Sequence, residues 1–363
     1  MSTDPWSHPR FLQLERARRR RGRLRQDVID LGHGGGGKAM RDLIDDLIMG
    51  AFAEVGLQAG EDQARLPLAE LTSGGDRLAF TTDSYVVSPL FFPGGDIGKL
   101  AVNGTINDLA VGGATPRWLS CGLILEEGLS VEVLRRVLGS MAAAARAANV
   151  VIATGDTKVV PRGKADQLFI NTAGIGVIPA GRDPRATGIL PDDVLLINGP
   201  LGDHAAAILV ARGELKLESE LRSDCAALHE LIASVAAEVP IHAMRDVTRG
   251  GLSAVLNELA LASEVGLVVD EERLPVRAEV RGLCEVLGLD PIHLANEGKV
   301  VMAVAAGDAA RALALLRAHP LGREAAQIGH ARPAPPGVVT MLTAVGGERI
   351  VDMLVGEPLP RIC

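Results

Sequence analysis

Residues 78–112 read LAFTTDSYVVSPLFFPGGDIGKLAVNGTINDLAVG, and this stretch guides the interpretation of the whole chain. Its first residues, rich in aromatic and β-branched types, predict a strand over Leu78–Thr82 that ends at Asp83. After the Pro-Gly-Gly turn at 93–95, apolar and small residues predict a helix near 96–112. The stretch thus combines a predicted strand that ends at an acidic residue with a glycine turn that leads into a helix.

Short β-branched runs and Ala/Leu-rich stretches continue on both sides of this unit. Val28–Leu31 reads as a short strand, and apolar residues from Met40 to Val55 recur at helical spacing. Further helices are predicted near 130–148, 203–213, 223–237, 251–264 and 308–318. Further strands are predicted near 117–125, 150–154, 167–177, 193–198, 265–269, 299–305, 338–343 and 349–353. This mixed order of elements favours an α+β fold over an alternating α/β sheet.

The chain has 363 residues, which exceeds the size of most single hydrophobic cores and predicts two domains. A polar, Pro-containing stretch over Arg182–Pro191 lies between two predicted strands, so we expect domains over 27–181 and 182–355, followed by a mobile tail over 356–363. Residues 1–26 form a basic extension with seven arginines between Arg16 and Arg25. They are either an arm for an acidic partner or RNA, or a disordered tail or product of an upstream start codon.

The composition is that of an ordinary globular protein, with 47% apolar and 23% charged residues. No apolar run approaches the roughly 20 residues that cross a bilayer, and no signal peptide begins the chain. A net charge of −8 and only nine aromatic residues (six Phe, two Trp, one Tyr) argue against nucleic-acid binding. The four cysteines lie far apart, without a zinc or disulfide pattern. We expect a cytoplasmic protein with neither a nucleic-acid nor a membrane partner.

Glycines crowd into residues 32–38, which read GHGGGGK. This run matches the phosphate-loop pattern except at Ala39, where the Mg²⁺-binding Ser or Thr is missing. It also matches the dinucleotide-binding glycine pattern, but without the βαβ context. Both patterns share backbone N–H groups that can surround phosphate oxygens, whereas the alternative is a flexible turn. The candidate phosphate-binding residues are Gly34, Gly35, Gly36, Gly37 and Lys38.

Five aspartates stand beside glycines or small residues where predicted strands or helices end. They are Asp76, Asp83, Asp108, Asp156 and Asp246. A single aspartate in such a place is typically a turn residue or a helix cap. Several converging carboxylates, however, hold the Mg²⁺ that bridges nucleotide phosphates. The set therefore predicts a magnesium–nucleotide site built without a phosphate loop.

The chain ends GEPLPRIC over 356–363. Its two prolines favour an extended arm, which at about 3.1 Å per residue reaches roughly 25 Å. An exposed terminal thiol is normally a liability, so Cys363 is either functional or accidental. Cys121, Cys225 and Cys284 lie in apolar or helical contexts and are expected to be core residues.

Together these motifs resemble the HypE family of hydrogenase maturation factors, which belongs to the PurM-like ATP-binding superfamily. The resemblance rests on Gly32–Lys38, Thr81–Val87, Phe92–Lys99, Asn103–Gly113, Gly155–Val160, Gly199–His204, Arg245–Gly251, Asn296–Gly298 and Pro360–Cys363. It spans residues 28–363, and the Pro-Arg-Ile-Cys ending is its most specific part. Ala205 departs from the pattern, since the family usually has glycine there.

The resemblance implies a PurM-like two-domain architecture. An N-terminal ATP-binding domain forms the dimer sheet or barrel, and an α+β C-terminal domain ends in a flexible tail. The implied activity is ATP-dependent dehydration of an S-carbamoyl group on Cys363 to a thiocyanate, which supplies the cyanide ligand of NiFe hydrogenase. The implied partners are a second copy of the chain, a HypF-type carbamoyltransferase and the HypC–HypD complex.

The resemblance also implies roles for individual residues. Cys363 would carry the carbamoyl group, and Glu297 and Lys158 would fill the acid and base roles. Besides the glycine run and Lys38, ATP would contact Asp83, Asn103, Asp108 and Thr157. Mg²⁺ would be held by Asp76, Asp83, Asp108, Asp156 and Asp246.

Two other kinds of function remain open at this stage. A related small-molecule kinase or ligase, of the thiamine-phosphate kinase or selenophosphate synthetase type, would have no use for Cys363, and the latter would need a reactive cysteine near the glycine run. A scaffold that binds ATP only as a switch would not turn over a carbamoylated tail.

Overall fold

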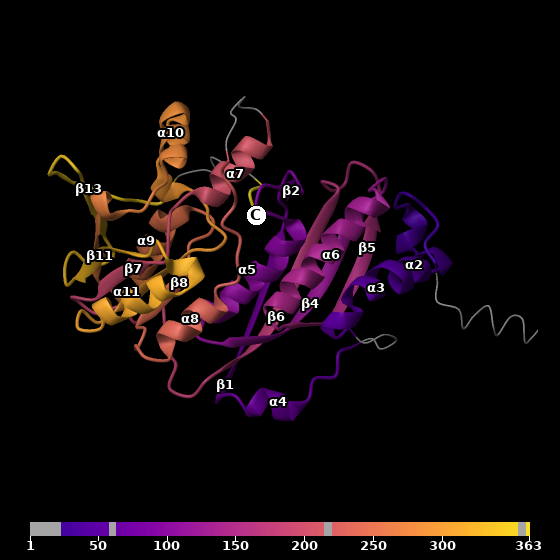
Figure 1. Ribbon diagram of the computed structural model, residues 1–363, viewed down its shortest axis with the longest axis horizontal. Coiled ribbons are helices and arrows are strands. Elements are labelled where there is room, and N and C mark those ends of the chain that lie inside the picture. The colour runs from indigo at the N-terminus through magenta and orange to yellow at the C-terminus, as the bar shows by residue number, and fades with distance from the viewer. Residues whose placement is uncertain (1–22, 58–62, 214–219, 355–360) are drawn as a thin grey trace, which may run out of the picture.

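Two sheets, each covered by helices, lie side by side in the computed structural model (Figure 1), which describes residues 23–57, 63–213, 220–354 and 361–363. The first sheet has the strand order β1-β6-β4-β5, and the second has the order β13-β12-β9-β11-β7-β10-β8. The predicted α+β fold class is confirmed. The first sheet ends at Ile178 and the second begins at Val194, so the predicted boundary over 182–191 falls between them.

The first sheet consists of β1 (Arg77–Tyr85), β4 (Thr115–Glu126), β5 (Val151–Val160) and β6 (Leu168–Ile178). β6 is antiparallel to β1 and β4, and β5 is parallel to β4. One face packs on α5 (Ile97–Val111) and α6 (Val131–Ala147). Asp83 is aligned with buried Thr172 on this helix-covered face, whereas the next row, Ser84–Asn171–Gly122–Asp156, points to the opposite face.

Helix α5 lies between the two domains and determines much of the site. Asp96 caps its start by accepting hydrogen bonds from the backbone N–H groups of Gly98 (2.8 Å) and Lys99 (3.2 Å). The helix packs on β1 and β6 of the first sheet and on α8 and β8 of the second domain. Contacts on both sides explain why α5 is buried almost all round and has only weak amphipathic character.

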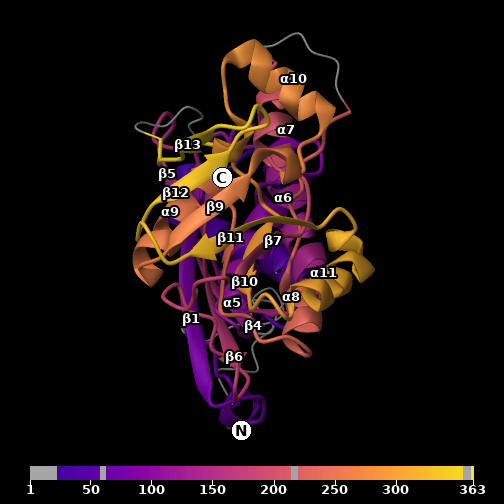
Figure 2. The ribbon, with the colours of Figure 1, turned by 90° about the vertical axis from the view of Figure 1, so that its left-hand side faces the viewer.

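The second sheet contains β7 (Val194–Ile197), β8 (Ala243–Asp246), β9 (Gly266–Asp270), β10 (Val300–Val304), β11 (Ala326–Arg332), β12 (Val339–Leu342) and β13 (Glu348–Ile350). One face packs on α9 (Gly251–Ser263), and the other packs on α8 (His229–Ala236) and α11 (Ala309–Ala318). Helices α7 (Asp203–Ala211) and α10 (Ala278–Leu287) lie at one end. In Figure 2, where the second domain faces the viewer, this sheet lies in front of the first.

Most predicted elements are present, but several differ in extent. The strand predicted over Leu78–Thr82 continues to Tyr85, so Asp83 lies inside β1. The strand predicted at Val28–Leu31 is wrong, because Val28 forms a single bridge with Ser130 and Leu31–Gly34 is a 3-10 turn capped by the Asp30 carboxylate. The helix predicted near 223–237 begins only at His229. The strand predicted at 150–154 continues to Val160, so Asp156 lies inside a strand rather than after one.

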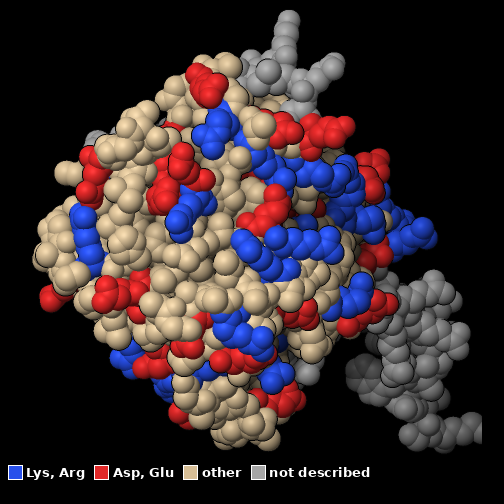
Figure 3. Space-filling view, turned by 60° about the vertical axis from the view of Figure 1, so that its left-hand side comes forward, with Lys and Arg blue, Asp and Glu red and all other residues tan. Residues whose placement is uncertain are grey.

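The helical path predicted from Met40 to Val55 is divided into α2 (Lys38–Leu43), a π-helical turn (Ile44–Ile48), α3 (Met49–Phe52) and a 3-10 turn (Ala53–Val55). The short elements α4 (Leu68–Thr72), β2 (Phe91–Phe92) and β3 (Gly95–Asp96) were not predicted, nor were α10, β8 and β11. No described helix is long and apolar enough to cross a membrane. On the face shown in Figure 3, basic and acidic side chains are intermingled over the described residues.

Candidate active site

The last three residues of the chain turn into the junction between the two domains (Figure 1). Ile362 is buried in the core cluster that also contains residues of both domains. The carbonyl oxygen of Arg361 accepts hydrogen bonds from the Ser88 backbone N–H (3.1 Å) and from Arg212 Nη2 (3.0 Å). Cys363 then lines a narrow cavity together with Asp83, Ser84, Tyr85, Gly104, Asp108, Asp246, Thr248, Arg249 and Glu297. The structure therefore brings the terminal cysteine to the predicted acidic residues.

The thiol of Cys363 and the carboxyl group of Glu297 lie beside each other in this cavity, and each affects the pKa of the other. Burial raises the pKa of Glu297 well above its ordinary value, and the charges of Asp224 and Asp246 raise it further. Burial also raises the pKa of Cys363, and the neighbouring Glu297 adds to that effect. The thiol of Cys363 is therefore uncharged at neutral pH when the tail occupies this position, and ionisation of Glu297 is disfavoured relative to an exposed glutamate.

The loop that carries Glu297 is fixed on both sides. Asp224 accepts hydrogen bonds from the backbone N–H groups of Glu297 (3.0 Å) and Gly298 (3.1 Å), and from Lys299 Nζ (2.8 Å). Before it, the buried Asn296 accepts from the Gly202 backbone N–H at 2.7 Å and donates to two backbone carbonyls. The acid/base candidate is thus held by a buried polar network rather than by a flexible turn.

Three of the five predicted metal ligands converge on the same cavity from three elements. Asp83 lies on β1, Asp108 on α5 and Asp246 at the end of β8. Thr81 Oγ1 donates to Asp108 Oδ2 at 2.9 Å. Burial and the charge of Asp108 raise the pKa of Asp246 to about 7. Burial, with a smaller effect of Asp83, raises the pKa of Asp108. Negative charge is therefore concentrated here.

These carboxylates offer the hard oxygen ligands that Mg²⁺ prefers, and their mutual repulsion is the kind that a cation relieves. As they stand, no three His, Cys, Asp or Glu side chains among the described residues are arranged to hold a metal ion. Carboxylate oxygens suit magnesium, but the three aspartates do not by themselves form a complete set of magnesium ligands.

The other two predicted metal ligands, and Lys158, lie elsewhere. Asp76 precedes β1, at the opposite end of the strand from Asp83, and pairs with Arg77 (3.4 Å). Asp156 and Lys158 form an exposed ion pair of 2.7 Å. Both side chains project from the face of the sheet opposite α5. Asp156 lies in the row next to that of Asp83, successive residues of a strand point to opposite faces, and Lys158, two residues on, points to the same face as Asp156. Within one chain, the sheet separates Lys158 from Glu297 and Cys363.

The glycine run lies along β5. A side chain at Gly34 would collide with the Val159 backbone nitrogen, 2.9 Å from the added Cβ, whereas Gly36 has φ +73° and open space around it. Lys38 is exposed and pairs with Asp42. Between this region and β5 lies a cavity of about 510 Å³, lined in part by Met40, Ile44, Thr154, Asp156 and Thr157.

The predicted ATP contacts thus fall into two groups. The glycine run, Lys38 and Thr157 lie near the edge of the sheet at β5, whereas Asp83 and Asp108 line the cavity that holds Cys363. Asn103 belongs to neither group directly, because its buried amide donates to Cys225 Sγ at 3.6 Å.

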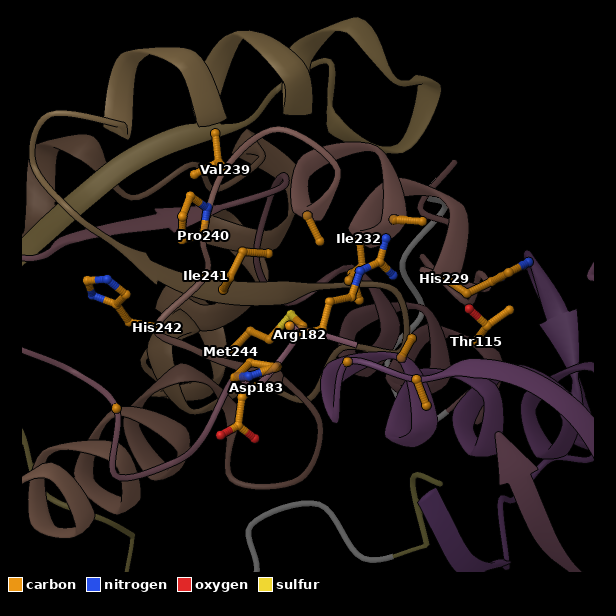
Figure 4. Close-up of a pocket in the computed structure, with 18 of the residues that line it drawn as sticks. Thr115, Arg182, Asp183, His229, Ile232, Val239, Pro240, Ile241, His242 and Met244 are labelled. Atoms are coloured by element: carbon orange, nitrogen blue, oxygen red, sulfur yellow. The ribbon is translucent and has the colours of Figure 1, made fainter. Parts of the chain in front are cut away.

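A separate cavity of about 370 Å³ opens where the connector between the domains meets α8 and β8 (Figure 4). Arg182 lies among apolar side chains that include Ile232, Ile241 and Met244. None of the predicted catalytic, metal or nucleotide residues lines it, so it is not the candidate active site.

Three residues that the structure places at the site had no role in the sequence-based prediction. Asp224 is the buried partner of Lys299, His204 contacts the tail, and Ser223 contacts His204. The sole signal was the lysine directly after the Asn-Glu-Gly motif, since a buried lysine needs a carboxylate. Asp224 lies far from Lys299 in the sequence, so no local pattern identifies it as that carboxylate.

Comparisons with known proteins agree with this architecture. The AIR synthase related protein N-terminal domain matches residues 60–178, and the corresponding C-terminal domain matches residues 191–341. The chain is 58% identical over 341 residues to carbamoyl dehydratase HypE of Rhodobacter capsulatus (94% of this chain, 99% of that protein). It is 54% identical over 335 residues to carbamoyl dehydratase HypE of Escherichia coli K12 (92% and 99%).

Solved structures extend the comparison. A hydrogenase maturation protein HypE in complex with ATP is 48% identical, with a TM-score of 0.87 over 92% of this chain and 99% of that one. HypE in a HypE–HypF complex is 46% identical, with a TM-score of 0.74 over 76% and 90%. Likeness to a thiamine monophosphate kinase of Aquifex aeolicus (20% identity, TM-score 0.56, covering 77% and 90%) extends to the fold alone. By identity over almost the full length of its relatives, the chain belongs to the HypE family of carbamoyl dehydratases.

Proposed function

We propose that this carbamoyl dehydratase acts on its own C-terminal cysteine. A carbamoyl group on the sulfur of Cys363 is dehydrated to a thiocyanate in an ATP-dependent reaction, and the cyano group then serves as the cyanide ligand of NiFe hydrogenase. The observation that carries the proposal is that Cys363 and Glu297 line the same cavity, together with three aspartates.

The chemistry explains why ATP is needed. The carbamoyl oxygen cannot leave as oxide, but transfer of the γ-phosphoryl group to that oxygen converts it into phosphate, a good leaving group. The C–O bond then breaks, the C≡N bond forms and both nitrogen protons depart. The balance is R–S–CO–NH₂ plus ATP giving R–S–C≡N, ADP, phosphate and a proton.

Glu297 is suited to accept a nitrogen proton. A carbamoyl group on sulfur takes the place of the thiol hydrogen, so it occupies the position that Glu297 faces. A carboxyl group with a raised pKa is a stronger base when ionised than an ordinary glutamate. Its backbone is fixed by Asp224, which keeps the carboxyl group in place during the reaction.

The nucleotide and its metal fit the two groups of residues described above. ATP binding is supported by the relative solved with ATP. Asp83, Asp108 and Asp246 would hold Mg²⁺, which supplies positive charge to the phosphates. The backbone N–H groups of Gly34–Gly37 and the ammonium of Lys38 would bind phosphate oxygens.

A second copy of the chain fits the exposed face of the first sheet. Leu78, Phe80 and Ile124 project from this face and are 54%, 72% and 40% exposed. Large exposed apolar side chains on a sheet face are typical of an interface. Asp156 and Lys158 lie on the same face, so a homodimer would enclose them between the two copies. The acid/base role of Lys158 depends on that enclosure.

The position of the tail also separates loading from dehydration. A thiol with a raised pKa is a poor nucleophile, because the thiolate is the reactive form. Loading of Cys363 by a HypF-type carbamoyltransferase would therefore take place with the tail outside the cavity, as would transfer to a HypC–HypD complex. The relative solved as a HypE–HypF complex supports the first of these partners.

The direct test is the intact mass of the protein and of its C-terminal peptide after incubation with HypF and carbamoyl phosphate, with and without ATP. We expect a carbamoyl adduct on Cys363 that loses water only when ATP is present. An unmodified Cys363, with ATP consumed on another substrate, would exclude the proposed reaction.

A further inference from the structure

We infer that His204 and Ser223 are positioning residues that hold the C-terminal tail in the cavity, with the thiol of Cys363 against Glu297. The importance of this tail position for catalysis rests on the proposed function, but the position itself does not.

His204 contacts the tail one residue before the reactive thiol. Its Nε2 atom lies 2.7 Å from the carbonyl oxygen of Ile362, and its Nδ1 atom lies 2.8 Å from Ser223 Oγ. A carbonyl oxygen can only accept, so Nε2 carries the hydrogen. Because burial lowers the pKa of His204, the ring is neutral and Nδ1 accepts from the Ser223 hydroxyl. The serine thus fixes the tautomer that binds the tail.

Both residues are themselves held in place. The His204 ring is fully buried and meets the Phe92 ring edge to face, with centroids 5.4 Å apart. Ser223 Oγ accepts from the Cys225 backbone N–H at 3.1 Å, and the Ser223 backbone N–H donates to Pro93 O at 2.8 Å. Ser223 comes from the second domain, whereas Phe92 and Pro93 come from the first. The two positioning residues are therefore anchored to both domains.

The residue that follows Ser223 positions the other member of the reacting pair. Asp224 accepts the backbone N–H of Glu297, as described above. Ser223 and Asp224 thus set the tail and the acid/base carboxyl group from one short segment. This arrangement explains how a chain terminus, rather than a rigid element, can meet a catalytic group reproducibly.

Further contacts fix the entry of the tail but not its tip. Arg361 adopts a left-handed backbone conformation (φ +55°), and its side chain pairs with Asp166. Its carbonyl oxygen is held by Ser88 and Arg212. These contacts act one residue farther from the thiol than the contact made by His204.

The test measures how fast iodoacetamide alkylates Cys363, followed by intact mass. A Cys363→Ala variant corrects for the three buried cysteines. In His204→Leu, which keeps an apolar side chain in the core but loses the donor, we expect alkylation to be about tenfold faster, the effect of one lost hydrogen bond on the docked fraction. In His204→Gln, whose amide can donate to the same carbonyl, we expect a rate close to that of wild type. This rescue would not follow from a purely structural role.

Ser223→Ala is a second, smaller change, and we expect it to increase the alkylation rate of Cys363 several-fold. Thermal unfolding of each variant shows whether the fold is retained. Wild-type alkylation rates in folded His204→Leu, or in folded Ser223→Ala if the first variant does not fold, would overturn the inference.

A second readout links the tail position to catalysis. In protein carbamoylated beforehand, His204→Leu should lower the single-turnover rate of water loss about tenfold without changing the ATP concentration for half-saturation. An unchanged turnover rate would contradict the link. If wild-type protein shows no ATP-dependent water loss while the variants still alter alkylation, then the proposed function fails and the role of His204 stands.

Discussion

The carboxyl group of Glu297 lies beside the thiol of Cys363 in the cavity between the two domains, where Glu297 is buried and Cys363 is half-buried. The two residues reach this position by different routes. Glu297 is held by the polar network of Asp224 and Asn296, whereas Cys363 arrives on the chain terminus, held through Ile362. A fixed acid/base group and a movable thiol are what a reaction on a tethered substrate needs.

Glu297→Gln should abolish dehydration but stabilise the protein. The amide cannot accept a nitrogen proton, so the carbamoylated form should accumulate on Cys363 in the presence of ATP. Because the folded state raises the pKa of Glu297, it opposes ionisation that the unfolded chain allows. At neutral pH the variant should therefore gain about 0.5–2 kcal/mol in the free energy of unfolding.

The stability gained by Glu297→Gln should depend on pH. Wild-type stability should fall, relative to the variant, as pH rises above the ordinary glutamate pKa of 4.5 towards the raised pKa of the folded state. Urea unfolding of both proteins at pH 5 and pH 8 measures it. If the difference in the free energy of unfolding between variant and wild type is the same at both pH values, then Glu297 is not buried as described.

Cys363→Ala should bind ATP and retain the fold, yet form no thiocyanate, because the sulfur that carries the carbamoyl group is absent. Cys284→Ala is the matched control, since Cys284 is a buried residue of α10 outside the cavity. Product measured by mass should be absent in the first variant and present in the second. Product formation in Cys363→Ala, or loss of its fold, would refute the role assigned to the tail.

The sequence predicted the convergence of Asp83, Asp108 and Asp246 for a sound physical reason. Each lies on or near the end of an element, and β1, α5 and β8 meet at the domain junction. The same reasoning did not place Asp156, because β5 continues past it, as β1 continues past Asp83, and the face to which a side chain points changes with every residue of a strand. Only the register of β4 with β5 and β6 shows which way Asp156 points.

The fold was predictable to a similar extent. Helical spacing identified α6 and α9, whose apolar residues face a sheet on one side. Helix α10 escaped because it packs through few buried residues, and β11 because its glycine and small residues hide the strand pattern. The contact between His204 and Ile362 joins residues at α7 and the chain terminus, and no local pattern reports such a pair.

Asp83→Asn should reduce magnesium-dependent ATP turnover by about 100-fold or more, the usual cost of removing one electrostatic group from a transition state. Asp76→Asn is the control, because Asp76 is exposed and pairs with Arg77 away from the cavity. We expect its turnover to stay close to that of wild type. Unchanged turnover in Asp83→Asn would remove that residue from the site, and a large loss in Asp76→Asn would restore the sequence-based prediction for Asp76.

Phe80→Glu should dissociate the proposed homodimer, because it replaces the most exposed of the three large apolar side chains on this face of the first sheet with a charge. Val345→Glu is the matched control, since Val345 is 95% exposed but lies in the turn between β12 and β13 of the second domain. Sedimentation velocity at several protein concentrations should give a monomer for the first variant and a dimer for the second. A dimer that persists in Phe80→Glu would exclude this face as the interface.

Asp224→Asn tests the network behind Glu297. Burial alone would raise the pKa of Asp224, but the charge and hydrogen bond of Lys299 outweigh this effect and lower the pKa below the ordinary aspartate value of 3.8. This pair therefore contributes stability above pH 3.8 that is lost as the pH falls through the folded-state pKa. The variant leaves the ammonium of Lys299 buried without its partner, at a cost of about 3–5 kcal/mol in the free energy of unfolding at pH 7.

The double variant Asp224→Asn/Lys299→Met distinguishes a buried charge from a general packing defect. Removing the unpaired ammonium should recover much of the lost stability, because an apolar side chain of similar length fills the same space. The exposed pair Arg146–Glu54 (2.6 Å) provides the control, and Glu54→Gln should cost about 0–1 kcal/mol. Urea unfolding of all three variants at pH 7 decides the question. If the double variant is no more stable than Asp224→Asn, then the backbone bonds to Glu297 and Gly298, rather than the ion pair, are what Asp224 contributes.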